Sequence, residues 1–239
     1  MALDGVKALV FDVFGTVVDW RGGIIRDAGP FLARHGGSAG DAEAFAIAWR
    51  GRYNPAMEEV RSGRRPFTRL DVLHREELER ILPDFGVDPR AVPEADLAEF
   101  NRAWHRLDLW PEVVDGLAQL KRGFIIATLS IGNIALLLGM AKRAGLPWDA
   151  TLGAEVAQAY KPAPEAYLRT ADILGLEPAQ VCLVASHNSD LAAARRCGLR
   201  TAYVIRPLEN GAPAKIIPPD QDWDAVCEGF DGLALQLGL

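Results

Sequence analysis

Cysteines, long apolar runs and leader-like segments are scarce or missing in this chain of 239 residues, and each shortage excludes a class of protein. The three cysteines, Cys182, Cys197 and Cys227, are odd in number and widely spaced, which suits neither a disulfide framework nor a metal site. No apolar run approaches the roughly 18 residues of a membrane-spanning helix. The N-terminus lacks a basic leader followed by a long apolar core, so no signal peptide is evident. We therefore expect a cytoplasmic protein without a membrane partner.

Long basic segments are missing as well. Asp and Glu number 32 against 26 Lys and Arg, which gives a formal net charge of −6 at pH 7. This balance argues against nucleic acid as the main partner. Apolar residues make up 49% of the chain, as in a globular protein, and its length fits a large domain or a core with an insertion.

Strand and helix patterns alternate from about residue 109. Apolar runs at 124–130, 181–186 and 201–205, with a shorter one near 151–152, are separated by helical stretches. Strands spaced in this way predict right-handed βαβ units on a parallel sheet. We predict an α/β protein whose doubly wound, Rossmann-like core comprises residues 1–19 and 109–239. The segment 207–219, rich in proline and glycine, is expected to be a surface loop, and 223–230 to supply a last edge strand.

The strand pattern disappears between residues 20 and 108. Residues 42–50 and 69–80 have helical periodicity, and 93–107 is expected to form another helix. The sequence therefore predicts a helical domain inserted after the first strand.

Asp12 is the most informative residue. It ends the apolar run of residues 7–11 and is followed by Gly15 and Thr16. Ligands of open α/β sheets bind beyond the carboxyl ends of such strands. A carboxylate there is a nucleophile or a metal ligand, unless it only caps the next turn.

The segment around Asp12 resembles the first motif of the haloacid dehalogenase superfamily, in which this aspartate attacks the substrate and becomes a covalent ester. Phosphatases of the superfamily carry a second aspartate two residues later as an acid, and this chain has Phe14. Loss of a general acid typically costs about 10²–10⁴ in rate, but a halide leaves without a proton. The pattern is therefore similar to the (S)-2-haloacid dehalogenase branch. This resemblance implies no metal and no cofactor, and it identifies residues 20–108 as a helical cap.

Further segments match the superfamily in order along nearly the whole chain. Ser130 lies at the same predicted sheet edge as Asp12. With nearby backbone amides its hydroxyl suits the binding of a substrate carboxylate or an oxyanion, and the alternative role of this residue is to cap the N-terminus of a helix. Lys161 is followed by two prolines that stiffen its turn, and it would keep Asp12 ionised. By resemblance, Thr16 and Lys161 would hold the carboxyl group of Asp12 during catalysis.

The segment 186–190 supplies the last expected catalytic residues. The resemblance assigns Asn188 to the orientation of Asp12 and Lys161, and Asp190 to the water that hydrolyses the ester. Similar dehalogenases space this pair one residue further apart, which leaves the identity of the base open. His187 is either a second candidate for the base or a turn residue.

Other side chains are expected to bind the substrate. Arg50 follows Trp49 in a pair from which similar dehalogenases extend an arginine to the halide or to the carboxylate. Tyr167 lines the site in dehalogenases of this kind, or else belongs to a helical core. The complete expected set of substrate-binding residues is Phe14, Trp20, Arg50, Ile131, Tyr167, Ser186 and His187.

Ile131 departs from the pattern, because similar dehalogenases have an asparagine there that cradles the halide. A 2-haloacid dehalogenase is still the leading hypothesis, with a small carboxylate as substrate and a homodimer as the usual state of relatives. The alternative is hydrolysis of L-azetidine-2-carboxylate by the same attack, since a ring amine needs no anion cradle. A Mg²⁺-dependent phosphatase and a binding module without catalysis are the weaker hypotheses.

Overall fold

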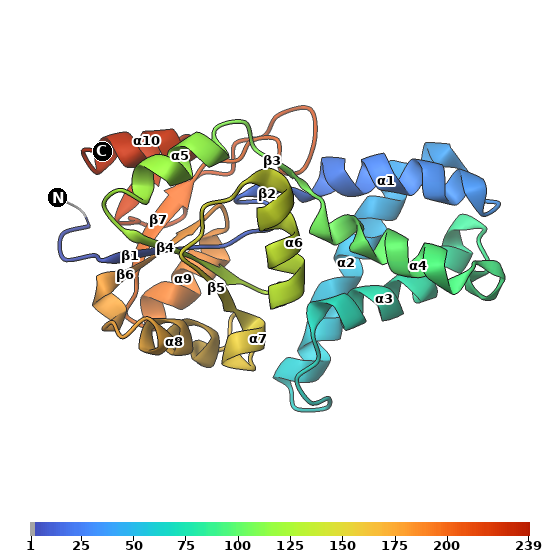
Figure 1. Ribbon diagram of the computed structural model, residues 1–239, viewed down its shortest axis with the longest axis horizontal. Helices are drawn as coiled ribbons and strands as arrows, with labels where there is room; N and C mark the ends of the chain where they lie inside the picture. The colour runs from blue at the N-terminus through green and yellow to red at the C-terminus, as the bar shows by residue number, and fades with distance from the viewer. Residues whose placement is uncertain (1–2) are drawn as a thin grey trace. The chain divides into compact units, whose positions relative to one another are not determined.

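The computed structural model describes residues 3–239 (Figure 1). The chain forms two compact units, one of Met1–Asp19 with Leu109–Leu239 and one of Trp20–Asp108. The short strands β2 (Val18–Asp19) and β3 (Asp108–Leu109) form a separate two-stranded sheet. No helix within residues 3–239 is long and apolar enough to cross a membrane.

The first unit is built on a six-stranded parallel sheet of order β5-β4-β1-β6-β7-β8. Its central strands are buried and rich in apolar residues, as expected for strands covered on both faces. The strands are β1 (Ala8–Phe11), β4 (Ile125–Ser130), β5 (Ala150–Gly153), β6 (Val181–Ala185), β7 (Arg200–Val204) and β8 (Ala225–Cys227). The predicted doubly wound, Rossmann-like α/β fold is confirmed.

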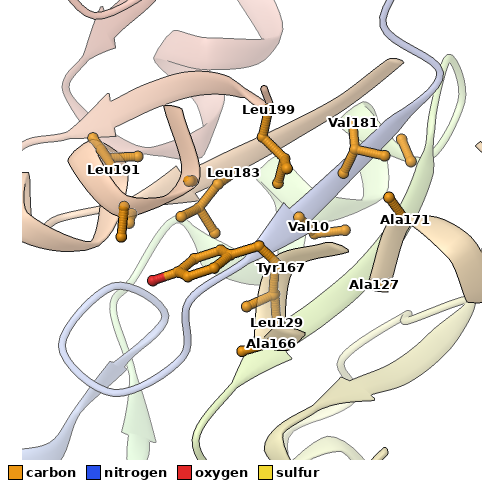
Figure 2. Close-up of a cluster of buried hydrophobic side chains, with 14 of the residues drawn as sticks. Val10, Ala127, Leu129, Ala166, Tyr167, Ala171, Val181, Leu183, Leu191 and Leu199 are labelled. Atoms are coloured by element: carbon orange, nitrogen blue, oxygen red, sulfur yellow. The ribbon is translucent and has the colours of Figure 1, made fainter. Parts of the chain in front are cut away.

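Helices cover both faces of this sheet. On one face, Tyr167 and Leu191 pack with Val10 and Leu183 of the sheet in a buried cluster (Figure 2). On the other face, the Phe11 ring lies 5.1 Å from the ring of Phe230. The helices are α5 (Val113–Leu120), α6 (Ile134–Ala144), α7 (Ala154–Ala157), α8 (Pro164–Ile173), α9 (Asn188–Arg196) and α10 (Gly229–Gln236), with the 3₁₀ turn η5 (Pro178–Gln180).

The second unit is helical. Its core is aromatic: the ring of Trp49 lies 5.3 Å from that of Trp104, and Phe31 stacks on Phe100 at 4.0 Å. The helices are α1 (Trp20–Arg34), α2 (Ala42–Arg61), α3 (Leu70–Ile81) and α4 (Glu94–Asn101), and the 3₁₀ turns are η1 (Ala39–Asp41), η2 (Leu82–Phe85), η3 (Pro89–Ala91) and η4 (Arg102–His105). The single helix expected over 93–107 is therefore wrong, since α4 ends at Asn101 and a 3₁₀ turn follows.

Candidate active site

Asp12 follows the central strand β1 and lies at the carboxyl edge of the sheet. Its backbone N–H donates to the carbonyl of Val184 at 3.0 Å, so the sheet register places it. Gly15 then turns the chain with φ +89°, a left-handed conformation that favours glycine. The turn returns Thr16, whose hydroxyl donates to Asp12 Oδ2 at 2.9 Å. Phe14, in the same turn, is buried.

Two cations flank the Asp12 carboxylate. Lys161 Nζ lies 3.2 Å from Oδ1, and His187 Nδ1 lies 3.2 Å from Oδ2. Burial raises the pKa of Asp12, but the charge of Lys161 and the hydrogen bond and charge of His187 outweigh it. The pKa of Asp12 is therefore well below its ordinary value, and the hydrogen bond from Thr16 lowers it further. Asp12 is a buried, ionised carboxylate.

Lys161 bridges two aspartates. Its ammonium donates to Asp190 Oδ2 at 2.6 Å as well as to Asp12. Burial lowers the pKa of Lys161, but the charges of Asp190 and Asp12 outweigh burial and raise it, so the side chain stays charged. The second oxygen of Asp190 accepts a 2.6 Å hydrogen bond from the Tyr167 hydroxyl.

Tyr167 serves both the core and the site. Its ring lies in the buried cluster of α8 and the sheet, and its hydroxyl extends from the edge of that cluster (Figure 2). Burial and the charge of Asp190 raise the pKa of Tyr167 above its ordinary value, so the phenol remains a donor. Tyr167 therefore holds Asp190 in place for Lys161.

Glu209 is a site residue that sequence reasoning missed. Its Oε1 lies 2.8 Å from His187 Nε2, so His187 stands between two carboxylates. Burial lowers the pKa of His187, but the hydrogen bonds and charges of Asp12 and Glu209 raise it to about 10. The other carboxylate oxygen accepts a long hydrogen bond of 3.5 Å from Ser186 Oγ.

The loop after β7 delivers Glu209. This loop belongs to the segment 207–219 that was predicted to lie on the surface, and for Glu209 that prediction is wrong because the residue is only 6% exposed. Arg206 anchors the start of the loop through Nε, which donates to the Thr16 carbonyl at 2.8 Å, and through an ion pair with Glu112. A usable signal existed: an acidic residue shortly after a parallel strand reaches the ligand-binding edge of the sheet.

Ser186 joins the loops after β1 and β6. Its backbone N–H donates to Thr16 Oγ1 at 2.9 Å, and its own hydroxyl lies 3.1 Å from the same atom. Ser186 is buried and supports Thr16 and Glu209.

The prediction that Asn188 orients Asp12 and Lys161 is wrong. Its amide nitrogen donates to the carbonyl of Pro218 at 2.9 Å, and its amide oxygen accepts from Trp223 Nε1 at 2.9 Å. Asn188 therefore ties the segment 218–223 to the start of α9.

Ser130 and Ile131 end β4 at the same edge of the sheet. Ser130 Oγ accepts a hydrogen bond from the N–H of Gly132 at 3.1 Å, so the hydroxyl organises its own turn. Ile131 is buried, with 9% of its surface exposed. Their contacts with substrate stay predictions.

Trp20 and Arg50 belong to the second unit. The guanidinium of Arg50 lies over the ring of Tyr53 at 4.0 Å and 5.1 Å from the centre of the Trp20 ring. Stacking of this kind orients a planar cation. The part of these two residues in substrate binding stays a prediction.

The gathered residues suit nucleophilic displacement. An ionised carboxylate at a sheet edge, with a lysine and a histidine beside it, can attack an electrophilic carbon and then be regenerated by water. Within residues 3–239, no cluster of three or more His, Cys, Asp or Glu side chains has the arrangement of a metal site.

Comparisons with known proteins agree with this chemistry. A sequence model of the family "haloacid dehalogenase-like hydrolase" matches residues 6–198. The (S)-2-haloacid dehalogenase 4A of Burkholderia cepacia is 30% identical over 220 residues, which cover 89% of this chain and 90% of the relative. A solved defluorinating L-2-haloacid dehalogenase is 48% identical, with a TM-score of 0.94 over 98% of this chain and 96% of the other. The L-2-haloacid dehalogenase of Xanthobacter autotrophicus with chloropropionic acid covalently bound is 25% identical, with a TM-score of 0.79 and 98% coverage of both chains.

Proposed function

The chain belongs to the haloacid dehalogenase-like hydrolase family, and within that family we propose that it displaces the 2-substituent of a small carboxylic acid, with a 2-haloacid as substrate. The relatives named above are (S)- or L-2-haloacid dehalogenases, which supports this substrate class. The carbon at position 2 of such an acid is open to attack by a carboxylate.

One observation carries the proposal: Asp12 is ionised and buried, with Lys161 Nζ 3.2 Å from Oδ1. The lysine keeps the nucleophile charged. It also supplies the positive charge that a divalent cation supplies in metal-dependent phosphatases. Asp12 attacks C2 in line and forms an ester. The halide departs as an anion, so Phe14 can stand where a phosphatase carries its acid.

The ester is then hydrolysed. Water attacks the aspartyl carbonyl carbon, the carbonyl–oxygen bond to the substrate breaks, and the 2-hydroxy acid leaves. Thr16 and Lys161 hold the carboxyl group through both steps, because each already binds one of its oxygens. The substrate carboxylate is assigned to Ser130 and the neighbouring backbone amides, and inversion at C2 follows from in-line attack.

A second function is favoured by one residue. Ile131 offers a buried apolar side chain where a halide would gain from a hydrogen-bond donor. L-azetidine-2-carboxylate would be opened by the same attack of Asp12, because its protonated ring nitrogen leaves as a neutral amine without an anion cradle.

Halide release tests the proposal. Purified protein with L-2-chloropropionate and excess chelator is expected to release chloride, and the variant Asp12→Asn is expected to release none. L-azetidine-2-carboxylate in parallel separates the two substrates. Chloride release that the chelator abolishes would contradict the metal-independent mechanism, and ring opening without chloride release would establish the second function.

A further inference from the structure

His187 lies between the nucleophile and a second buried carboxylate. We propose that His187, oriented by Glu209, is the base that removes a proton from the water attacking the Asp12 ester, and that Asp190 instead holds Lys161. This inference rests on the proposed function and assigns one of its steps.

Both oxygens of Asp190 are already engaged. Oδ2 accepts a 2.6 Å hydrogen bond from the ammonium of Lys161, and Oδ1 accepts a 2.6 Å hydrogen bond from Tyr167. A proton taken from water would have to be placed on an oxygen that already accepts one of these short bonds. The side chain of Asp190 is also only 10% exposed. Asp190 is therefore built to hold the lysine rather than to receive a proton.

His187 also contacts two groups, but the partner of its Nδ1 is the carboxyl group that becomes the ester. Its Nδ1 lies 3.2 Å from Asp12 Oδ2, so this nitrogen is directed at the carboxyl group where the ester must be hydrolysed. The side chain is 32% exposed, whereas Asp12 and Lys161 are each 9% exposed, so water reaches the carboxyl group most readily beside the imidazole. A base must lie within reach of the proton it removes, and His187 meets this requirement.

Glu209 orients the imidazole. Its contact with Nε2 at 2.8 Å places the N–H of the ring on that nitrogen, which leaves Nδ1 to accept a proton. The position of the carboxylate depends on Gly15, because a β-carbon at Gly15 would collide with Glu209 Oε1. A side chain at position 15 would therefore displace the Glu209 carboxylate from its place beside His187.

The proton balance closes with the groups present. In the resting site His187 is protonated and donates to both carboxylates, since these raise its pKa to about 10. Formation of the ester removes the charge of Asp12, so the pKa of His187 falls and its Nδ1 proton passes to solvent as the halide leaves. Nδ1 then takes a proton from water as the oxygen bonds to the carbonyl carbon. The same proton passes to the departing alkoxide, and the second proton of the water, left on the Asp12 carboxyl group, returns to Nδ1. The resting ion pair is restored, and the products are one hydroxy acid, one halide ion and one proton.

The test separates formation of the ester from its hydrolysis. Wild type, His187→Ala, Glu209→Gln and Asp190→Asn are mixed with L-2-chloropropionate, and chloride release and intact protein mass are followed after rapid acid quench. Glu228→Gln, which neutralises an exposed glutamate of the same unit, is the matched control. His187→Ala is expected to release about one equivalent of chloride, retain the adduct and turn over about 10²–10⁴-fold more slowly.

The other variants sharpen the assignment. Glu209→Gln keeps the size of the side chain, so it is expected to fold and to accumulate the same adduct. Loss of the carboxylate makes the His187 imidazole a weaker base, and each unit by which its pKa falls weakens proton binding tenfold, so hydrolysis is expected to slow by about 10–100-fold. Asp190→Asn is expected to lose the chloride burst without accumulating adduct. The burst itself shows that a variant has a folded site.

Three results would overturn the inference. Hydrolysis at the wild-type rate in both His187→Ala and Glu209→Gln would overturn the role given to His187 and leave the proposed function intact. Accumulation of the adduct only in Asp190→Asn would do the same. Absence of chloride release from the wild type would overturn the proposed substrate, and the inference with it.

Discussion

Replacement of Lys161 by methionine would leave two buried aspartates without their shared cation. The ammonium lies 3.2 Å from Asp12 Oδ1 and 2.6 Å from Asp190 Oδ2, with 9% of the side chain exposed. At an effective dielectric constant of about 20, two unit charges 3.2 Å apart attract by about 5 kcal/mol. Removal of one partner from a buried pair costs about 3–5 kcal/mol. We therefore expect the free energy of unfolding of Lys161→Met to fall by about this amount at pH 7.

The same replacement is expected to abolish ester formation. Without the charge of Lys161 the pKa of Asp12 rises, because burial then opposes ionisation with less compensation. Urea denaturation measures the stability, and the chloride burst measures ester formation, with Lys142→Met at an exposed position of α6 as control. A Lys161→Met protein with wild-type stability and a normal burst would refute the role given to this lysine.

Three further perturbations address the surroundings of Asp12. Gly15→Ala should lower the free energy of unfolding by about 1–3 kcal/mol and also lower activity, because it combines a left-handed φ with a collision against Glu209. Gly63→Ala, which also has a left-handed φ but open space around the added methyl group, should lose stability and keep its activity. The pKa of His187 is raised above its unfolded value of about 6.5 to about 10, so its stabilisation is complete below about pH 6.5 and is lost as pH rises through 10. The stability gap between wild type and His187→Gln, about 2 kcal/mol after allowance for solvent exposure, should therefore shrink from pH 6 to pH 10 in urea titrations. Asn188→Ala should lower the melting temperature by loss of its loop hydrogen bonds, with a normal chloride burst; a lost burst would restore its predicted catalytic role.

The sheet could be predicted because its strands are buried on both faces. Such strands are continuous apolar runs, and the helices between them fix a parallel order. The convergence of Asp12 and Lys161 could be anticipated for the same reason, since segments that follow parallel strands gather at one edge.

Glu209 and Asn188 show what sequence reasoning did not reach. Proline and glycine around Glu209 indicate a loop, but its burial depends on Arg206, His187 and the missing side chain of Gly15, which come from distant segments. Asn188 lies at the expected position in the chain, but it is the first residue of α9, and its amide points to the segment 218–223. Side-chain direction at a helix start depends on tertiary partners.

In the ester mechanism, Asp12 supplies the oxygen of the 2-hydroxy acid product. A single turnover with excess protein and L-2-chloropropionate in H₂¹⁸O tests it, with mass analysis of the product and of the peptide that contains Asp12. Unlabelled 2-hydroxy acid and one ¹⁸O in the Asp12 carboxyl group are the expected result, because water attacks the aspartyl carbonyl carbon. Label in the first equivalent of product, with an unlabelled Asp12, would show direct attack of water on the substrate and would contradict the ester mechanism.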